Sequence, residues 1–371
     1  MKSNCHPELV SGSMDCRALK LYVVAAGSGG HILPALTIAK RWLEQNPHGK
    51  IIFWGASGAL DHKIVADTDF LSKVINLKIG KFSFKRILLL PILIVQVLLA
   101  FLKSFLRAIK DRPEKIISTG GLISIPVCLG CRLAFVPVEI YELNLEPGKA
   151  VKLLMPIANK IFVAFKNTVS LCNFMGLSFA KKCELTHYPI RFTRDVFEIT
   201  KQQIIDRINE KADKPFSLQR KTIFLLGGSQ GSKMLNYALK KFLEHNKNIH
   251  GQIQVIHQIG NDISFDWRTF YKDLSEPAVL FSYDENIQNF YLLSDLVICR
   301  AGAGTLFELE FFQKRSIVVP LVADSTGHQV KNAKAMAQEY PELFKLVYQD
   351  ELVSNPEKFE KLILTMLFES N

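Results

Sequence analysis

The chain has the sequence LYVVAAGSGGHILP at residues 21–34. The apolar residues at 21–25 predict a buried strand, and a glycine-rich turn and the start of a helix follow it. This order leaves backbone N–H groups free at a helix N-terminus, which carries about half a positive charge and therefore favours phosphate. Glycine lets a ligand approach the backbone closely, and His31 adds a group that exchanges protons near neutral pH.

The second half of the chain repeats this pattern twice. KTIFLL at 221–226 predicts a buried strand, and GGSQGS at 227–232 predicts a glycine turn before a helix. RAGAGT at 300–305 follows another apolar run and leads to Glu308. A carboxylate shortly after a glycine turn suits the vicinal hydroxyls of a ribose. The helix dipole alone also favours an acidic residue near a helix start, so both interpretations stay open at this point.

Strand and helix patterns alternate in both halves of the 371-residue chain, which is long enough for two domains. We therefore expect an α/β fold with two Rossmann-like domains, whose parallel sheets face a central cleft. The expected limits are a disordered tail at 1–18, a first domain at 19–190, a linker region at 191–220, a second domain at 221–352 and a C-terminal helix at 353–371. The tail lacks the apolar run of a signal peptide, so we expect a cytoplasmic protein.

The net charge of +11 is unevenly distributed. Residues 71–115 contain ten Lys and Arg and two acidic residues, a net of +8. Within them lies an apolar run of sixteen residues, 87–102, which Pro91 interrupts; a membrane-spanning helix needs about 20. One interpretation is a buried core helix with solvated basic flanks. The other is an apolar face that docks on an anionic membrane surface through residues 81–115. Nucleic acid is a poorer partner, because the segment matches no recognition motif.

A polar segment near the C-terminus adds a further candidate binding surface. His328, Gln329 and Asn332 lie at the start of a predicted helix. Gln329 and Asn332 are three residues apart and share a helix face, where they can hydrogen-bond sugar hydroxyls. Polar residues of this kind are also common on ordinary protein surfaces.

These motifs together resemble the MurG family of N-acetylglucosaminyltransferases over residues 21–340. The resemblance rests on the order and spacing of short segments: GSGGH at 27–31, TGG at 119–121, YELN at 141–144, YPIR at 188–191, GGSQGS at 227–232, RAGAGT at 300–305 and HQ at 328–329. It implies the GT-B fold, with the C-terminal helix packing back on the first domain. The chain departs from the family where Tyr141 and Leu143 replace a His and a Gln, two polar groups expected to face the cleft.

The resemblance implies transfer of GlcNAc from UDP-GlcNAc to the 4-hydroxyl of the MurNAc of lipid I. The product is lipid II of peptidoglycan synthesis, and the reaction inverts the anomeric carbon without a metal or a cofactor. The enzyme is then a peripheral protein on the cytoplasmic face of the inner membrane. The alternatives are a GT-B enzyme with another lipid acceptor such as diacylglycerol, a UDP-GlcNAc epimerase, and a degenerate paralogue that only binds UDP-sugar.

The resemblance also implies roles for individual residues. His31 is the candidate general base, or alternatively only positions the acceptor. The expected contacts of the acceptor diphosphate are the first-domain turn residues Gly27, Ser28, Gly29, Gly30, Gly120 and Gly121. Within the donor site, Arg191 is expected to face phosphate, Glu308 the ribose and the Tyr283 backbone the uracil. The full set expected to contact the donor is Ser28, Gly29, Gly30, Asn144, Arg191, Ser229, Tyr283, Ala303, Gly304, Thr305, Glu308, His328, Gln329 and Asn332.

Overall fold

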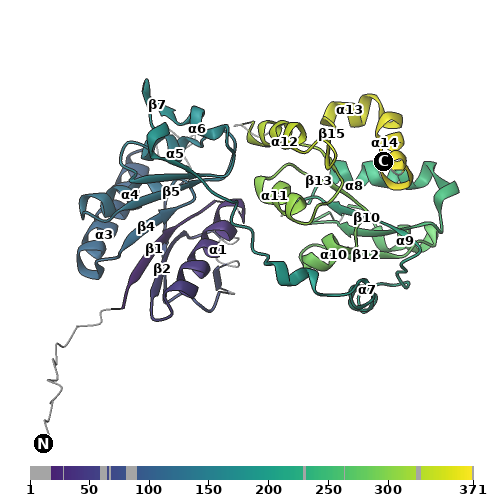
Figure 1. Cartoon of the computed structure of the whole chain (residues 1–371), viewed down its shortest axis with the longest axis horizontal. Coiled ribbons are helices and arrows are strands. Elements are labelled where there is room, and N and C mark those ends of the chain that lie inside the picture. Colours follow the sequence, from purple (N-terminus) through teal and green to yellow (C-terminus); the bar gives the residue numbers. More distant parts are fainter. Residues whose placement is uncertain are drawn as a thin grey trace, which may run out of the picture.

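The computed structural model describes residues 18–27, 29–58, 65–66, 68–80, 90–228, 231–262, 264–322 and 327–369. The chain forms two α/β domains, each built on a parallel sheet that carries helices on its faces (Figure 1). The predicted tail lies outside the described residues except for Ala18. The predicted site residues Ser28 and Ser229, and the basic residues between 81 and 89, also lie outside them.

The first sheet has seven strands in the order β3-β2-β1-β4-β5-β6-β9, and every neighbouring pair is parallel. The central strand β1 (Lys20–Val24) lies between β2 (Lys50–Ala56) and β4 (Lys115–Ser118). The strand order reverses at this point, and ligands of such sheets bind at the carboxyl ends beside the reversal. The other strands are β3 (Lys73–Leu77), β5 (Val138–Glu142), β6 (Lys160–Val163) and β9 (Cys183–Leu185).

The residues of β1 alternate between two apolar layers. Leu21 and Val23 pack with the buried face of α1 (Gly29–Gln45). Tyr22 and Val24 pack on the other face, in the cluster to which α3 (Leu90–Asp111) and α4 (Ser124–Leu133) contribute. Burial on both faces explains why the sequence of this strand is continuously apolar. The smaller elements of this domain are α5 (Lys149–Leu154), α6 (Thr168–Leu171), β7 (Asn173–Phe174) and β8 (Leu177–Ser178).

Helix α3 is longer and more exposed than the sequence predicted. It has 22 residues, and only Ala100, Ser104 and Ala108 are buried. These small residues allow a close approach to α4, where a Cβ at Gly130 would come within 2.2 Å of the Ser104 Oγ. The interpretation as a buried core helix is therefore wrong. The expectation that the apolar run is too short to span a membrane is also wrong. By length and composition alone, α3 is long and apolar enough to cross one.

The second sheet has six parallel strands in the order β12-β11-β10-β13-β14-β15. Its central strand β10 (Lys221–Leu226) lies between β11 (Ile253–Gln258) and β13 (Leu296–Cys299). The outer strands are β12 (Ala278–Phe281), β14 (Ser316–Val318) and β15 (Phe344–Leu346). The helices are α8 (Lys233–His245), α9 (Trp267–Leu274), α10 (Ile287–Leu293), α11 (Ala303–Phe311), α12 (His328–Glu339), α13 (Gln349–Ser354) and α14 (Pro356–Phe368).

The chain between the sheets belongs structurally to the second domain. It carries α7 (Lys201–Asn209), which packs against α10. Helix α14 also packs on the second domain, because Phe359, Ile363 and Met366 enter the same apolar cluster as β10 and β13. Figure 1 shows α14 at the end of the molecule far from the first domain. The expectation that the C-terminal helix packs back on the first domain is therefore wrong.

Candidate active site

The two glycine segments of the first domain meet around the His31 ring. A Cβ at Gly120 would lie 3.3 Å from the His31 Cε1, and the Thr119 Oγ1 donates to the His31 carbonyl at 2.8 Å. A Cβ at Gly121 would come within 2.6 Å of the Ala26 carbonyl oxygen. Gly120 and Gly121 have φ of +104° and +95°, which L side chains rarely adopt. Only glycine therefore allows this approach.

The pKa of the His31 imidazole is lowered, which favours the neutral form. Burial lowers its pKa below the ordinary value of 6.5; a hydrogen bond with the Thr119 backbone opposes this shift, and the nearby His328 adds to it. The Nδ1 atom of His31 is buried, and it has no hydrogen-bond partner among the residues that the structure describes. A neutral imidazole is the protonation state that a general base requires.

A buried carboxylate shapes the loop after β5. Glu142 accepts hydrogen bonds from the backbone N–H groups of Asn144 at 2.9 Å and Gly148 at 2.8 Å. It also accepts one from the Asn144 side-chain amide at 3.2 Å. Burial raises the pKa of Glu142, and these hydrogen bonds oppose the increase. The carboxylate thus fixes the position of Asn144.

The two neighbours of Glu142 that depart from the family motif pack inside the first domain. The Tyr141 ring stacks on Phe162 with centroids 4.6 Å apart, and Leu143 is only 2% exposed. The expectation that these positions face the cleft is wrong. An aromatic side chain is tolerated at Tyr141 because it packs against the apolar cluster around α1, and an aliphatic one at Leu143 because the position is buried.

Residues from two segments converge on Glu308 in the second domain. The Tyr291 hydroxyl donates to Glu308 at 2.8 Å, and the Arg191 Nε lies 3.6 Å from its other carboxylate oxygen. Burial raises the pKa of Glu308, whereas Arg191 and Tyr291 lower it. The predicted ribose ligand and the predicted phosphate cation are therefore neighbours. Tyr291 was not predicted, because in sequence it is one apolar position of a helical pattern.

The predicted residues Ala303, Gly304 and Thr305 are the first three residues of α11. A Cβ at Gly304 would lie 3.2 Å from the Tyr188 hydroxyl, and the Tyr188 ring stacks on Phe307 at 4.8 Å. The connection between the domains therefore runs along α11, which is how Arg191 reaches Glu308.

A partly buried cation, Arg300, to which the motifs assign no role, lies behind the second glycine turn. The Arg300 guanidinium donates to the Ser232 Oγ at 2.7 Å, the Val319 carbonyl at 3.2 Å and the Gln349 Oε1 at 3.1 Å. Burial lowers its pKa, and no carboxylate forms an ion pair with it among the described residues. Ser232 caps α8, so this positive charge sits at the start of the helix that follows the turn. In the sequence, the feature that could have indicated this cation is a charged residue directly after the apolar strand β13.

The predicted sugar-binding residues Asn144 and Asn332 come together from different domains. The Asn332 amide donates to the Asn144 Oδ1 at 3.1 Å, and the Leu145 N–H donates to the Asn332 Oδ1 at 2.9 Å. Lys331 pairs with Glu146 beside them. This contact joins α12 to the loop after β5.

The remaining predicted donor residues lie on the second domain. The Gln329 Oε1 accepts from the Leu321 N–H at 3.0 Å, so this atom faces its own domain. Tyr283 follows β12 and is 67% exposed. His328 begins α12 and is close enough to lower the pKa of His31 in the other domain.

Comparisons with known proteins define the class of this protein. Residues 21–163 match the glycosyltransferase family 28 N-terminal domain, and residues 222–371 match the glycosyltransferase family 28 C-terminal domain. The chain is therefore a glycosyltransferase of the GT-B fold, and the fold class predicted from the sequence is confirmed.

Individual relatives narrow the class to a family. The UDP-N-acetylglucosamine–N-acetylmuramyl-(pentapeptide) pyrophosphoryl-undecaprenol N-acetylglucosamine transferase of Thermodesulfovibrio yellowstonii is 30% identical over 332 residues, covering 86% of this chain and 82% of the relative. The protein of the same name from Pelagibacter ubique is 30% identical over 319 residues, covering 85% and 81%. The chain belongs to this family, that of MurG, as its motifs predicted.

Solved structures agree on the fold. A crystal structure of MurG from Acinetobacter baumannii matches with a TM-score of 0.68 and 23% identity, covering 94% of this chain and 90% of that one. UDP-GlcNAc 2-epimerase from Neisseria meningitidis matches with a TM-score of 0.60 and 13% identity, covering 93% and 94%. The fold is thus shared with epimerases, and it is sequence identity that assigns the family.

We expect Glu308→Ala to weaken UDP binding by about 1–3 kcal/mol, the scale of a lost hydrogen bond to a charged group. Isothermal titration calorimetry with UDP measures this change. Glu310→Ala is the matched control, because Glu310 lies on the same helix and is also partly buried. A Glu308→Ala protein that binds UDP as tightly as the Glu310→Ala protein contradicts the ribose assignment.

Proposed function

We propose that this protein transfers GlcNAc from UDP-GlcNAc to the 4-hydroxyl of the MurNAc of lipid I, giving lipid II and UDP. The observation that carries this proposal is the 30% identity, over most of the chain, to enzymes named for that acceptor. The geometry supports it, because His31 of the first domain lies near His328 of α12, and α1 contacts α11, the helix that carries Glu308.

The acceptor side of the proposed reaction needs a base. The MurNAc 4-hydroxyl oxygen forms a bond to the anomeric carbon of GlcNAc, its proton passes to the base, and the bond from that carbon to the UDP oxygen breaks. His31 is our candidate, since burial lowers its pKa and so favours the neutral imidazole. Gly120 lies against the His31 ring and Gly121 against the Ala26 backbone, and we propose that both positive-φ glycines receive the acceptor diphosphate.

The donor side needs positive charge where the UDP diphosphate departs. Arg191 is partly exposed beside Glu308, and Arg300 has only neutral partners among the described residues. The N-terminal ends of α8 and α11 add their dipoles. Fixed dipoles and cations in a site of low dielectric stabilise developing negative charge strongly. We propose that these groups replace a metal ion in this role.

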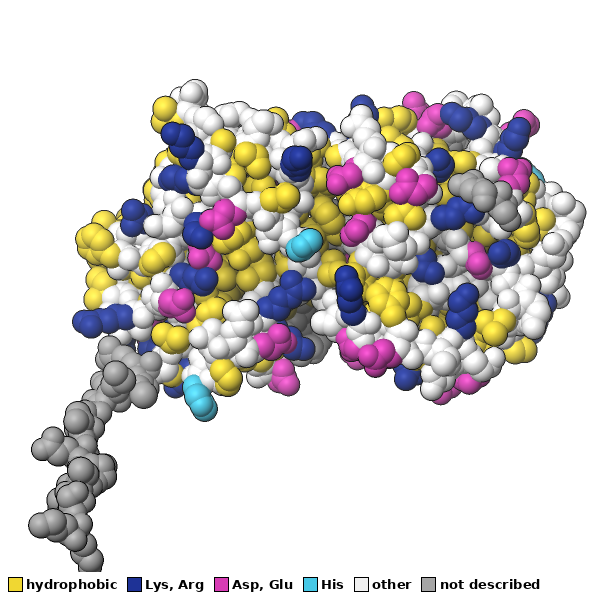
Figure 2. Space-filling view, in the orientation of Figure 1, with side chains coloured by type: hydrophobic (Ala, Val, Ile, Leu, Met, Phe, Trp, Pro, Cys, Tyr) yellow, Lys and Arg dark blue, Asp and Glu magenta, His cyan; other side chains and the backbone are white. Residues whose placement is uncertain are grey.

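We also propose that the protein docks on an anionic membrane surface through the exposed face of α3. Figure 2 shows hydrophobic side chains gathered at the edge of the first domain that α3 forms, with Lys and Arg beside them. The exposed large apolar residues on α3 are Leu90, Ile92, Ile94, Val95, Leu98, Leu99, Leu102, Leu106 and Ile109. Phe135, just beyond α4, is 88% exposed.

The packing of α3 favours a helix that lies along the membrane. A transmembrane position would separate Ala100, Ser104 and Ala108 from the domain core and break the Ser104 contact with α4. Lying on the surface keeps these contacts, and Lys103 and Lys110 are then close to anionic headgroups, each contributing about 1 kcal/mol.

The direct test of the proposed activity is a transfer assay with radiolabelled UDP-GlcNAc and a short-chain lipid I analogue. We expect labelled lipid II and UDP, formed equally in the presence of EDTA. Diacylglycerol is the competing acceptor. Product from diacylglycerol alone would overturn the acceptor assignment, binding of UDP without product would indicate a binding protein, and loss of activity in EDTA would contradict the metal-free mechanism.

We expect His31→Ala to lower kcat by about 10²–10⁴, the usual contribution of a general base. UDP affinity should change little, because the residues expected to hold the ribose and the diphosphate, Glu308 and Arg191 among them, lie on the second domain or its connection. Since a base must be neutral and burial lowers the pKa of His31, the kcat of the wild type should fall with acid only below pH 6.5. Steady-state kinetics against pH and lipid I measure both effects. A kcat within threefold of wild type excludes the base, and a raised acceptor KM alone indicates positioning.

We expect vesicle binding to increase with anionic lipid and to decrease with salt, because exposed charges are screened within about 8 Å at physiological ionic strength. Sedimentation with phosphatidylglycerol and phosphatidylcholine vesicles measures it. The variant pair Lys103→Glu and Lys110→Glu should lose binding, whereas Lys241→Glu with Lys247→Glu on the second domain should not. Equal binding to both vesicle types contradicts the electrostatic contribution, and no binding to either contradicts the docking surface.

A further inference from the structure

Gln258 occupies the point where three strands of the second sheet end. It is the last residue of β11, and it pairs in register with Leu226 of β10 and Phe281 of β12. The glycine turn at 227–232 follows β10, and Tyr283 follows β12. Gln258 therefore lies between the two segments that the proposed function assigns to the phosphates and the base of the donor.

The Gln258 side-chain amide bonds to both of these segments. Its Oε1 accepts from the Gly228 N–H at 3.0 Å, and its Nε2 donates to the Ser282 carbonyl at 3.1 Å. The residue is only 6% exposed. Both partners are backbone groups, so the amide fixes main-chain geometry. A neutral amide provides a donor and an acceptor together, which neither a carboxylate nor an ammonium does.

The contact with Ser282 determines the direction of the next N–H group. The Ser282 carbonyl and the Tyr283 N–H belong to one planar peptide, and in a trans peptide they point in opposite directions. Because the carbonyl is turned toward Gln258, the Tyr283 N–H is turned away from it. The orientation of the group proposed to meet the uracil edge thus depends on the Gln258 amide.

The residues that follow Gln258 support the other end of the glycine turn. A Cβ at Gly231 would come within 2.7 Å of the Gly260 Cα. The Ile259 carbonyl accepts from the Asn236 side chain on α8 at 3.2 Å. Gly228, with φ of +86°, begins the turn at the Gln258 amide. The end of β11 therefore contacts the turn at both its start and its close.

We propose that Gln258 is a positioning residue for the donor: its amide joins the phosphate turn to the base-binding segment and holds both in the arrangement that UDP requires. This inference rests on the proposed placement of UDP-GlcNAc on the second domain. Gln258 acts through the backbone of Gly228 and Ser282.

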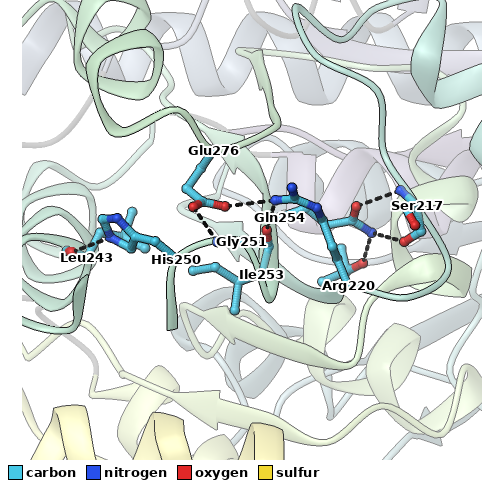
Figure 3. Close-up of polar contacts among 9 residues, drawn as sticks. Ser217, Arg220, Leu243, His250, Gly251, Ile253, Gln254 and Glu276 are labelled. Atoms are coloured by element: carbon cyan, nitrogen blue, oxygen red, sulfur yellow. Dashed lines mark hydrogen bonds and ion pairs between the residues drawn. The ribbon is translucent and has the colours of Figure 1, made fainter. Parts of the chain in front are cut away.

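The same strand contains a matched control. Gln254 lies four residues earlier on the same face of β11 and is fully buried. Its amide bonds to the backbone N–H and carbonyl of Ser217 and to the Thr222 Oγ1, at 2.9, 3.1 and 2.8 Å (Figure 3). It therefore loses comparable hydrogen bonds when replaced, but at the amino end of the sheet, away from both donor segments.

The test compares Gln258→Met with Gln254→Met by calorimetry with UDP, thermal melting and steady-state kinetics. We expect Gln258→Met to raise the Kd for UDP about tenfold or more, because two buried backbone groups lose their partner. The KM for UDP-GlcNAc should increase likewise, and the KM for the lipid I analogue should not change. Gln254→Met should lower the melting temperature similarly and leave the Kd for UDP within threefold. A folded Gln258→Met protein with wild-type UDP affinity overturns the proposal.

Gln258→Glu isolates the base end and serves if the methionine variant does not fold. The carboxylate can still accept from Gly228, but it places a second acceptor against the Ser282 carbonyl. Uridine lacks phosphates, so added negative charge does not repel it, and its affinity should still fall. Unchanged uridine affinity in this variant contradicts the role at the base end. Glu308→Ala distinguishes a failure of the proposed donor site from a failure of the proposed role of Gln258. If Glu308→Ala and Gln258→Met both bind UDP as tightly as the wild type, the donor site is wrongly placed. If Glu308→Ala loses UDP affinity and Gln258→Met does not, only the role of Gln258 fails.

Discussion

Glycine turns at the carboxyl ends of the two sheets depend on backbone contacts that leave no room for a side chain. A Cβ at Gly121 would collide with the Ala26 carbonyl, and one at Gly231 with Gly260. These contacts join Gly121 to the residue that follows β1 by two positions and Gly231 to the segment after β11. A rigid turn presents its backbone N–H groups without reorganisation, which is what stabilisation of a diphosphate requires.

Around these turns, the pKa values of ionisable groups are shifted from their values in water. Burial lowers the pKa of His31 and raises that of Glu308, and Arg191 and Tyr291 oppose the increase at Glu308. Arg300 is surrounded by neutral oxygen atoms and the Gln349 amide in the described structure. A buried cation without an anionic partner is costly, and an incoming diphosphate reduces that cost. The electrostatics of the second domain therefore favour an anionic ligand at the end of β10 and β13.

Apolar residues of the first domain either pack in its core or lie exposed on α3. Its core takes alternate residues of β1, whereas α3 keeps most of its apolar face exposed and contacts the core through three small residues. An exposed face of this kind, with cations beside it, is a feature of proteins that bind another surface. The proposed membrane surface therefore lies on the first domain, and the proposed donor residues lie mainly on the second.

The strand–turn–helix units, their parallel order, the positions that require glycine and the family can all be predicted from the amino-acid sequence. Local patterning and backbone sterics decide these features, and both are visible along the chain. Contacts between distant segments were decided only by the tertiary structure. Helix α14 packs on the second domain because its apolar face fits that sheet, and α3 stays exposed because only Ala100, Ser104 and Ala108 turn inward. The proximity of Arg191 to Glu308, and of Gln258 to Gly228 and Ser282, also follows from packing. A hydrogen bond between residues far apart in sequence depends on where the sheet brings their backbones, and no local pattern encodes that position.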